Sequence, residues 1–258
     1  MAGLPLEDEV AAPSRPVVNN ALIAVNIAVF LIGITAPGLL YPGARNYGDV
    51  LQALGMVPYH IVRGEKLYTL VTSMFLHANL IHLLGNMLFL HIFGDNVEAV
   101  MGKWRYLAFY LAAGFAATVF HLTSIALIPP TGLVSRYEYS PWLVPAIGAS
   151  GAISGVLGAY LVLYPGAMLR AVFFWGFIPV FYRIPAAIYI VFWFAYQLVM
   201  GIFSLTRLTA TGVAFWAHIG GFIAGIAMLP LFANKKLLRY YREAVWRSEY
   251  GFGGYDYE

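Results

Sequence analysis

The chain has 258 residues, of which 61% are hydrophobic and only 10% are charged, whereas ordinary soluble domains contain roughly 25% charged residues. Long apolar blocks with so few charges exclude a soluble globular domain and predict a membrane protein, and the net charge of +3 is too small to indicate a nucleic-acid partner. The absence of cysteine excludes disulfides, thiol nucleophiles and cysteine-rich zinc sites.

The chain on either side of the first apolar block is polar or mixed in character. Residues 1–18 are acidic and spaced by prolines, which predicts a short disordered cytoplasmic tail. Asn19 and Asn20 can cap a first membrane span at about residues 20–40. Residues 41–73 carry too many charges to cross a membrane and too many apolar residues for a solvated linker. We therefore expect this loop to lie partly in the membrane interface.

Five further apolar blocks complete a predicted membrane domain over residues 19–232, with spans at about 75–96, 104–127, 148–164, 184–204 and 212–232. The fourth of the six spans is short because Pro165 must end its helix. Twelve uncharged residues lie between Arg170 and Arg183. As a helix they would reach only about 18 Å against a hydrocarbon core of about 30 Å, so we expect this segment to be interfacial. Residues 233–258 form a basic and aromatic segment that predicts a cytoplasmic tail.

Six spans place both ends of the chain on the same side of the membrane. Of the fifteen lysines and arginines, those that fall on the opposite side are Arg45, Arg63, Lys66, Arg136 and Arg207. The others fall on the side of the termini, and cytoplasmic segments are the ones that carry the excess of such residues. The sequence therefore predicts a multi-pass protein of the plasma (inner) membrane with both termini in the cytoplasm. A seventh span within residues 166–182 would break this agreement.

A serine lies among small residues at the start of the fourth span, in the sequence PAIGASGAISG that begins at Pro145. From Ser150 to Pro165 a helix rises about 22 Å, so a helix that ends at the inner interface leaves Ser150 several ångströms below the outer surface. His82 and His218 each lie about 21 Å above the inner ends of their own spans. Because non-helical backbone at this depth must be buried or face water, we expect a sunken cavity where the three segments meet.

Small residues recur every four positions on the fourth and sixth spans, at Gly151, Gly155, Ala159, Gly221 and Gly225. Such stripes alone indicate no more than close packing of helices. Here one stripe follows Ser150 and the other follows His218, so close approach would also bring a hydroxyl and an imidazole within hydrogen-bond distance. A serine activated by a base requires this geometry.

His82 and Asn86 are four residues apart and therefore share one face of the second span. Polar pairs inside a span usually face the interior of the bundle, and neutral N–H donors suit an oxyanion hole. The alternative is an ordinary hydrogen-bonded pair between helices, which is the commoner role of such residues taken alone. His77, His82 and His91 do not share a helix face and have no acidic partner, so we expect no metal site.

Together these segments resemble the rhomboid family of intramembrane serine proteases over about residues 20–232. The sequence FLHANLIHLLGN, which ends at Asn86, is similar to the family's second-helix signature. Gly148-Ala-Ser-Gly151 resembles its GxSG motif, and Ala217-His-Ile-Gly-Gly221 resembles its sixth-helix histidine motif. Each motif is weak alone, but the three in this order are specific. The resemblance implies an all-α polytopic bundle of six membrane helices with a short, submerged fourth helix.

The resemblance also implies the roles of individual residues. Ser150 would be the nucleophile and His218 the general base of a catalytic dyad that needs no cofactor and no metal. His82, Asn86 and the backbone N–H of Ser150 would bind the oxyanion. The glycines that would support the site are Gly148, Gly151 and Gly221. Glu98 resembles the acid at the inner end of the family's second helix, for which we expect a structural role.

The sequence departs from the family pattern at two places. A Trp-Arg pair that is common in the first loop of the family is replaced by Tyr68 and Thr69, which implies a different anchoring of that loop. Ser154 stands where members often carry an aromatic residue that stacks on the catalytic imidazole. We therefore expect His218 to be held in another way.

The leading hypothesis is an intramembrane serine endopeptidase that cleaves transmembrane-helix substrates near the outer membrane surface. The expected partners are transmembrane protein substrates, which the resemblance implies would enter near the fifth helix, and the lipid bilayer, but not nucleic acid. The alternative is a non-catalytic rhomboid-like protein that binds membrane helices. A transporter is a third class, but the sequence contains no inverted repeat of the kind that transporters use.

Overall fold

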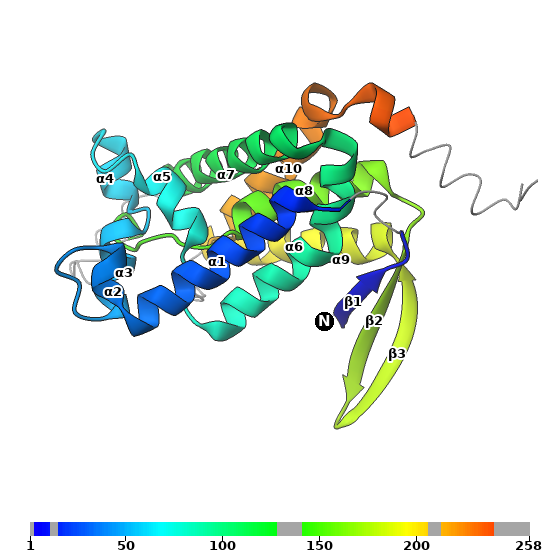
Figure 1. Cartoon of the computed structure of the whole chain (residues 1–258), viewed down its shortest axis with the longest axis horizontal. Helices are drawn as coiled ribbons and strands as arrows, with labels where there is room; N and C mark the ends of the chain where they lie inside the picture. Colours follow the sequence, from blue (N-terminus) through cyan, green and yellow to red (C-terminus); the bar gives the residue numbers. More distant parts are fainter. Residues whose placement is uncertain (1–2, 11–14, 128–140, 206–212, 240–258) are drawn as a thin grey trace, which may run out of the picture.

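The computed structural model describes residues 3–10, 15–127, 141–205 and 213–239 (Figure 1). Helices long and apolar enough to cross a membrane are α1 (Val17–Thr35), α6 (Leu80–Met101), α7 (Lys103–Ala126), α9 (Ala186–Leu205) and α10 (Phe215–Phe232). The apolar helix α8 (Ser150–Leu163) is shorter, with 14 residues. The predicted all-α polytopic membrane bundle with a short fourth helix is therefore confirmed.

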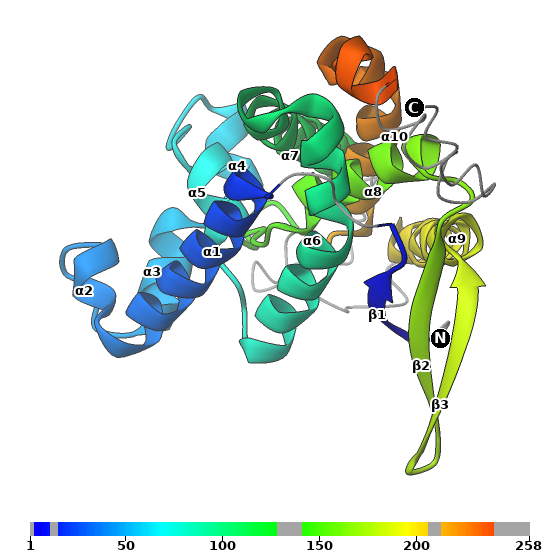
Figure 2. The same cartoon turned by 45° about the vertical axis from the view of Figure 1, so that its right-hand side comes forward.

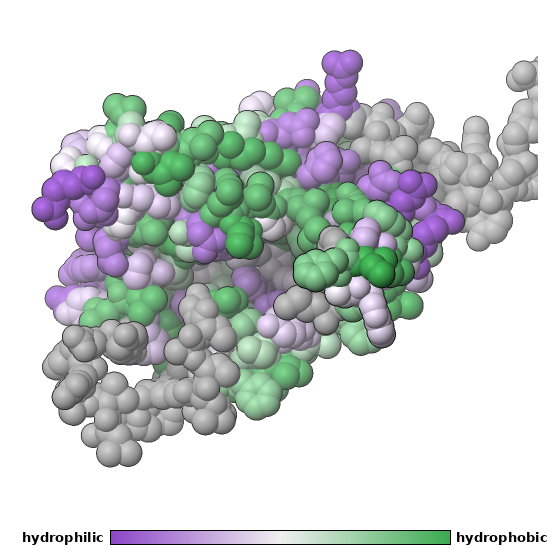
Figure 3. All heavy atoms as spheres, turned by 90° about the horizontal axis from the view of Figure 1, so that it is seen from below, coloured by the Kyte–Doolittle hydropathy of each residue, from purple (hydrophilic) through white to green (hydrophobic). Residues whose placement is uncertain are grey.

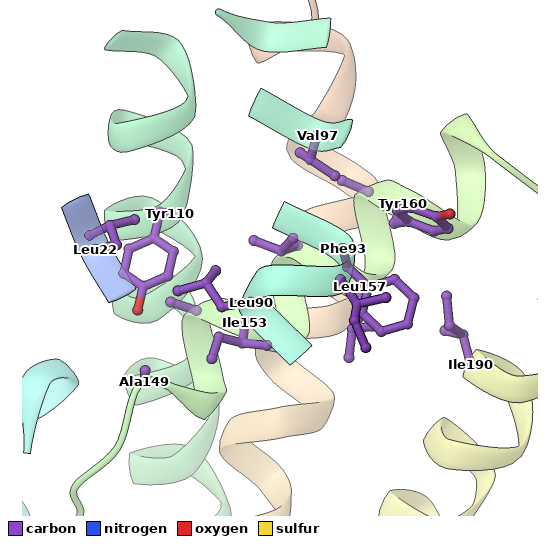
Figure 4. Close-up of a cluster of buried hydrophobic side chains, with 14 of the residues drawn as sticks. Leu22, Leu90, Phe93, Val97, Tyr110, Ala149, Ile153, Leu157, Tyr160 and Ile190 are labelled. Atoms are coloured by element: carbon purple, nitrogen blue, oxygen red, sulfur yellow. The ribbon is translucent and has the colours of Figure 1, made fainter. Parts of the chain in front are cut away.

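Hydrophobic residues cover much of one face of the molecule, and hydrophilic residues gather toward its ends (Figure 3). Inside the bundle, α8 lies among α6, α7 and α10 (Figures 1 and 4). The central core joins side chains from α6, α7 and α8, among them Leu90, Phe93, Val97, Tyr110, Ile153, Leu157 and Tyr160. The core thus holds α8 on several sides and fixes the position of its first residue, Ser150.

Glycines allow α8 and α10 to approach closely, as their spacing predicts. A Cβ atom on Gly221 would overlap the backbone oxygen of Gly151, and a Cβ atom on Gly225 would overlap that of Gly155. Gly151 and Gly155 in turn face Ala117 and Ala113 of α7. Backbones at this separation leave no room for any side chain, so the stripes place the start of α8 directly beside α10.

The expected loop at residues 41–73 is largely helical. It contains α3 (Tyr47–Leu54), α4 (Pro58–Val62), α5 (Thr69–Thr72) and the start of the 3₁₀ helix η1 (Ser73–Phe75), and it follows the short α2 (Pro37–Leu40). The hydroxyl of Tyr68 donates to the carbonyl of Ala53 over 3.2 Å, and the hydroxyl of Thr72 donates to that of Leu54 over 2.6 Å. These bonds join α5 to the end of α3, which explains how the segment is anchored without the Trp-Arg pair.

A three-stranded sheet, which we did not predict, lies at the end of the bundle where α8 ends, whereas Ser150 begins that helix (Figures 1 and 2). Its antiparallel strands are β1 (Leu4–Asp8), β2 (Met168–Trp175) and β3 (Ile178–Pro185), in the order β1-β2-β3. The prediction that residues 1–18 are a disordered tail was wrong for β1. Glu7 and Glu9 pair with Arg170 and Arg183, and these ion pairs and the backbone ladder order the segment.

The helix starts also differ from the predicted ones. α6 begins five residues later than predicted because Asn79 caps it, accepting a hydrogen bond of 2.9 Å from the backbone N–H of His82. α1 begins at Val17, before Asn19 and Asn20, so neither residue caps it. The carboxylate of Glu98 takes that role, because it accepts hydrogen bonds from the backbone N–H groups of Val18 and Asn19 at 3.1 and 2.7 Å. Glu98 is 2% exposed. Its expected structural role is therefore to cap α1 from α6.

Two predicted segments fall partly outside the described residues. Of the loop expected at 128–147, only residues 141–147 are described, and of the tail at 233–258, only residues 233–239 are described. Within the tail, Lys235 and Lys236 begin a short helical stretch after α10. The arginines of the predicted cytoplasmic cluster beyond residue 239 lie outside the described part of the chain.

Candidate active site

Ser150 is the first residue of α8, and Gly148 sets the turn that leads into it. Gly148 has a φ of +123°, which L side chains rarely adopt, and a Cβ atom there would lie 3.0 Å from the ring of His82. Its backbone N–H donates to the carbonyl of Ser73 over 2.9 Å. The chain therefore reaches α8 along a fixed path, which requires glycine at position 148.

The hydroxyl of Ser150 contacts the imidazole of His218, which lies in the first turn of α10. The distance from Ser150 Oγ to His218 Nε2 is 2.7 Å. The two residues are 68 positions apart in the chain, and the glycine contacts between α8 and α10 bring them together. The predicted serine–histidine pair is thus assembled with the hydrogen bond that proton transfer requires.

The second ring nitrogen of His218 contacts Gln197 of α9. His218 Nδ1 lies 2.9 Å from Gln197 Oε1, and Gln197 is 5% exposed. The ring of Trp193, also on α9, lies 6.2 Å from the imidazole ring at an interplanar angle of 33°. Sequence reasoning missed both residues, although a single amide within the apolar fifth span was a usable signal.

Ser154 does not contact the imidazole. Its hydroxyl donates to the carbonyl of Ser150 over 2.6 Å, one turn back along α8. The expectation that His218 is held differently from the aromatic-stacked family pattern therefore has a structural basis. The support comes from α9, through Gln197 and Trp193, in place of a side chain on α8.

His82 and Asn86 of α6 lie beside Ser150 with their donors available. The backbone N–H of Ala78 donates to His82 Nδ1 over 3.3 Å, so the ring hydrogen of a neutral His82 resides on Nε2, on the side of the ring that faces Gly148. The side-chain nitrogen of Asn86 is buried and has no hydrogen-bond partner among the described residues. An unpaired buried donor is costly, and this one lies at the wall of a cavity where a ligand oxygen can satisfy it.

A cavity of about 650 Å³ connects these residues. Its wall includes Ser150 and His218, the expected oxyanion donors His82 and Asn86, and the ring of Trp193. Because α6, α8, α9 and α10 all contribute to it, the cavity lies within the bundle. A cavity therefore lies at the place where the three motifs meet, as predicted, whereas its depth below the outer membrane surface stays a prediction.

His77 and His91 flank His82 in the sequence but differ in their surroundings. His77 is fully buried, and its ring lies 5.1 Å from that of His82 in an edge-on arrangement. His91 is exposed on the surface of α6. Among the described residues no group of three or more His, Cys, Asp or Glu side chains is placed to hold a metal ion.

Comparison with known proteins identifies the family. A model described as the Rhomboid domain matches residues 64–235. The chain is 31% identical over 121 residues to RHOMBOID-like protein 12, mitochondrial, of Arabidopsis thaliana. The matched region covers 46% of this chain and 36% of the relative. It is 31% identical over 147 residues to Rhomboid protease GluP of Bacillus subtilis (strain 168). Here the matched region covers 57% of this chain and 24% of the relative.

A third relative is Inactive rhomboid protein 1 of Drosophila melanogaster, 32% identical over 110 residues, which covers 42% of this chain and 7% of the relative. In all three comparisons the matched region spans well under half the length of the relative. The family model covers most of this chain, from the end of the first loop to the end of α10. The chain therefore belongs to the rhomboid family, and the three relatives include one named as a protease and one named as inactive.

Proposed function

We propose that this protein is an intramembrane serine endopeptidase that cleaves transmembrane-helix substrates with a Ser150–His218 dyad. The observation that carries the proposal is the 2.7 Å contact between Ser150 Oγ and His218 Nε2 at the wall of a cavity inside a membrane bundle. A hydroxyl and an imidazole at this distance form a nucleophile and its base. An inert helix-binding protein has no need for this pair.

In the proposed reaction, Ser150 Oγ attacks the scissile carbonyl carbon while His218 Nε2 takes the hydroxyl proton. The carbonyl oxygen becomes an oxyanion that accepts from Asn86 Nδ2, His82 Nε2 and the backbone N–H of Ser150. His218 then gives its proton to the leaving amine, and the C–N bond breaks to leave an acyl-enzyme on Ser150. A water molecule in the cavity, deprotonated by His218, then attacks the ester carbonyl of the acyl-enzyme. The ester bond to Ser150 Oγ breaks, His218 returns the proton to that oxygen, and the second product is released as a carboxylic acid.

The substrates we propose are membrane-spanning proteins, because the cavity lies within the bundle. A peptide carbonyl inside a helix is already hydrogen-bonded, so the scissile segment must leave its helix before Ser150 can reach it. Glycine, proline or small residues near the cleavage site lower the cost of that step. Entry beside α9 fits its loose packing, since 28% of its apolar stretch is buried, against 50% for α6. We further propose cleavage near the outer surface of the plasma (inner) membrane, with both termini in the cytoplasm.

Covalent labelling tests the proposal directly. Purified protein in detergent is treated with a fluorophosphonate, and the modified residue is mapped by mass spectrometry. We expect label on Ser150 in the native chain and none in Ser150→Ala or His218→Ala, and a model transmembrane substrate should be cleaved by the native chain alone. The matched control is Ser154→Ala, which removes a hydroxyl one turn away and should keep the label.

The opposite result would favour the alternative, a non-catalytic protein that binds membrane helices. That result is folded protein in which Ser150 stays unlabelled and the substrate stays intact. The observation behind this alternative is the 32% identity to a relative named as inactive. Binding of the uncleaved substrate helix by the Ser150→Ala variant would then measure the remaining function.

A further inference from the structure

The hairpin of β2 and β3 sorts its side chains onto two faces. Residues alternate along a strand, and paired residues of neighbouring strands point to the same side. One side, which we call the apolar face, consists of Leu169, Ala171, Phe173, Trp175, Ile178, Val180, Tyr182 and Ile184. Arg170 and Arg183 are paired on the other side, where they meet Glu7 and Glu9 of the N-terminal segment, and this side also carries Val172, Pro179 and Phe181 farther out. The charges are thus confined to one face, near the base of the hairpin.

The base of the apolar face packs against the helix bundle. Leu169 and Ala171 are completely buried. Asp8, which pairs with Leu169 in the register, accepts hydrogen bonds from Tyr160 of α8 at 2.6 Å and Asn96 of α6 at 2.7 Å. The apolar face is therefore the side of the sheet that points toward the membrane-crossing helices.

Farther from the base, the same face becomes exposed. The exposed fraction is 42% for Phe173, 46% for Val180, 65% for Ile178 and 75% for Trp175. Figures 1 and 2 show the hairpin running sideways past the end of α9, across the direction of the long helices. The turn at the tip is also apolar, since Phe177 is fully exposed and no residue between Arg170 and Arg183 is charged.

We propose that the outer half of this hairpin lies in the surface of the bilayer, at the end of the bundle opposite Ser150, with its apolar face against lipid acyl chains. The surface is continuous with the outward side of α9, which follows β3 directly and exposes Val191 and Phe192 on a helix apolar enough to cross a membrane. Aromatic side chains favour this boundary, and the arginines remain on the water side. The sheet thereby extends the lipid contact of the protein sideways beside α9.

Site-directed spin labelling tests this placement, and the absence of cysteine makes every label unique. Nitroxides are placed by Val180→Cys on the apolar face and Phe181→Cys on the opposite face, in vesicles of phosphatidylcholine and phosphatidylglycerol. Val191→Cys on α9 gives the lipid reference and Lys236→Cys the water reference. We expect the ratio of oxygen to nickel-chelate collisions at position 180 to match that at 191, and to exceed that at 181 several-fold.

Two results would overturn the proposal. A ratio at position 180 equal to that at 236 would place the apolar face in water. Low collision rates with both reagents, together with dipolar broadening between labels, would show that a second copy of the chain covers the face. A third arm adds an unlabelled transmembrane substrate, and a loss of oxygen collisions at 180 only in its presence would assign the face to substrate.

A separate observation concerns Gln197, and this second inference rests on the proposed function. Its amide oxygen is 2.9 Å from His218 Nδ1. His218 Nε2 can accept the proton of Ser150 only if the ring hydrogen resides on Nδ1, and that hydrogen needs an acceptor. We infer that Gln197 is a positioning residue: it accepts a hydrogen bond from His218 Nδ1 and so fixes the tautomer and orientation of the base.

The position of Gln197 couples the base to α9. Of the long helices, α1 and α9 have the smallest buried share, and α9 supplies the partner that orients His218. Displacement of α9 from α10 would break the contact and misalign the imidazole. The base is therefore aligned only when α9 is packed against the bundle.

The test compares Gln197→Met, which keeps the shape but removes the acceptor, with Gln197→Glu, which keeps an acceptor. Loss of a carboxylate partner from a catalytic histidine costs about 10⁴-fold in kcat, so for a neutral amide we expect a smaller loss, roughly tenfold to a hundredfold. KM and the unfolding temperature should stay unchanged in the Met variant, and the Glu variant should retain most of the rate. Val199→Leu, two positions farther along α9 and half exposed, is the matched control.

The outcomes separate this inference from the proposed function. If the native chain labels at Ser150 and Gln197→Met keeps the native kcat, the positioning role is wrong and the protease stands. If the native chain does not label, the protease itself is wrong. Equal losses in the Met and Glu variants would also overturn the positioning role, because packing and not the acceptor would then be what the base requires.

Discussion

The two ends of the bundle bury polar side chains in different ways. At the end that carries the sheet, Glu98 caps α1 from α6, Tyr106 of α7 donates to Asn19 over 2.8 Å, and Asp8 joins β1 to α6 and α8. At the other end, the chain of contacts from Gln197 through His218 to Ser150 ends at a cavity. The first set connects elements to one another, whereas the second is directed toward open space.

The difference separates the polar groups that hold the fold from those that are available for chemistry. A buried polar group that bonds the backbone of another helix fixes the position of that helix. A buried donor such as Asn86 Nδ2, which has no partner among the described residues, gains its hydrogen bond only from a ligand. Substitutions at the sheet end should therefore change stability, and substitutions at the cavity should change activity.

The largest expected effect on stability is that of Glu98→Ala. The change removes two charge-assisted hydrogen bonds from the first turn of α1 and leaves two N–H groups uncapped at a buried site. We expect a loss of about 2–4 kcal/mol in the free energy of unfolding, measured by denaturant titration in detergent micelles. Fluorophosphonate labelling of the fraction that remains folded should proceed at the native rate.

The control for Glu98 is Glu65→Ala, which breaks an exposed cluster with His60 and Arg63 and should have little effect. Glu98→Gln should fall between the two because it retains an acceptor. A native stability for Glu98→Ala would contradict the view that this end of the bundle is held by its buried bonds. A selective loss of labelling would place Glu98 in the catalytic machinery instead.

A smaller loss is expected when α8 and α10 are separated. In Gly221→Ala the new Cβ overlaps the carbonyl oxygen of Gly151, so the helices must move apart, at a cost of about 1–3 kcal/mol. The same movement lengthens the contact between Ser150 Oγ and His218 Nε2, so the rate of labelling at Ser150 should also fall, even in the fraction of the protein that stays folded. Gly85→Ala is the matched control, because a Cβ atom at position 85 meets nothing within 4 Å. Similar behaviour of the two variants would show that the helices are not in backbone contact.

Much of the membrane bundle and the contact between Ser150 and His218 could be predicted from the sequence, because their signals are local or are fixed by depth. Apolar blocks give the helices, and Pro165 and the position of Ser150 give the short α8 and its level in the membrane. The sheet could not be predicted in the same way. β1 becomes a strand through partners more than 150 residues away, and its acidic sequence alone is that of a disordered tail.

Gln197 shows a different limit of sequence reasoning. A single amide in an apolar span indicates a polar contact, but it does not say which helix supplies the partner. Only the packing of α9 on α10 places its oxygen at His218 Nδ1. Similarly, the glycine stripes predict that α8 and α10 approach closely. The position of α1 against α6 depends instead on Glu98, whose partners are backbone N–H groups that have no sequence signature.

The most gradual expected effect, spread over several pH units, concerns Asp8 and the pH dependence of stability. Burial raises the pKa of Asp8 to about 7 from its usual value of 3.8, although the hydrogen bonds from Tyr160 and Asn96 oppose that rise. Between about pH 4 and pH 7 the folded protein thus binds a proton at Asp8 that the unfolded chain does not bind. The stability that Asp8 contributes is complete below pH 4, falls as the pH rises to 7 and is then lost. For one proton the slope is at most about 1.4 kcal/mol per pH unit.

Asp8→Asn removes this proton while keeping an acceptor for Tyr160, so its stability should depend less on pH than that of the native chain. The measurement is the free energy of unfolding of both proteins at pH 5, 6, 7 and 8. Because Asp8 joins β1 to both α6 and α8, the native sheet should also loosen as the pH rises, and spin labels on the hairpin should gain mobility between pH 6 and 8. Parallel stability curves for the two proteins would show that Asp8 titrates alike in the folded and unfolded chains, and the sheet end would then be held by its backbone ladder and surface ion pairs alone.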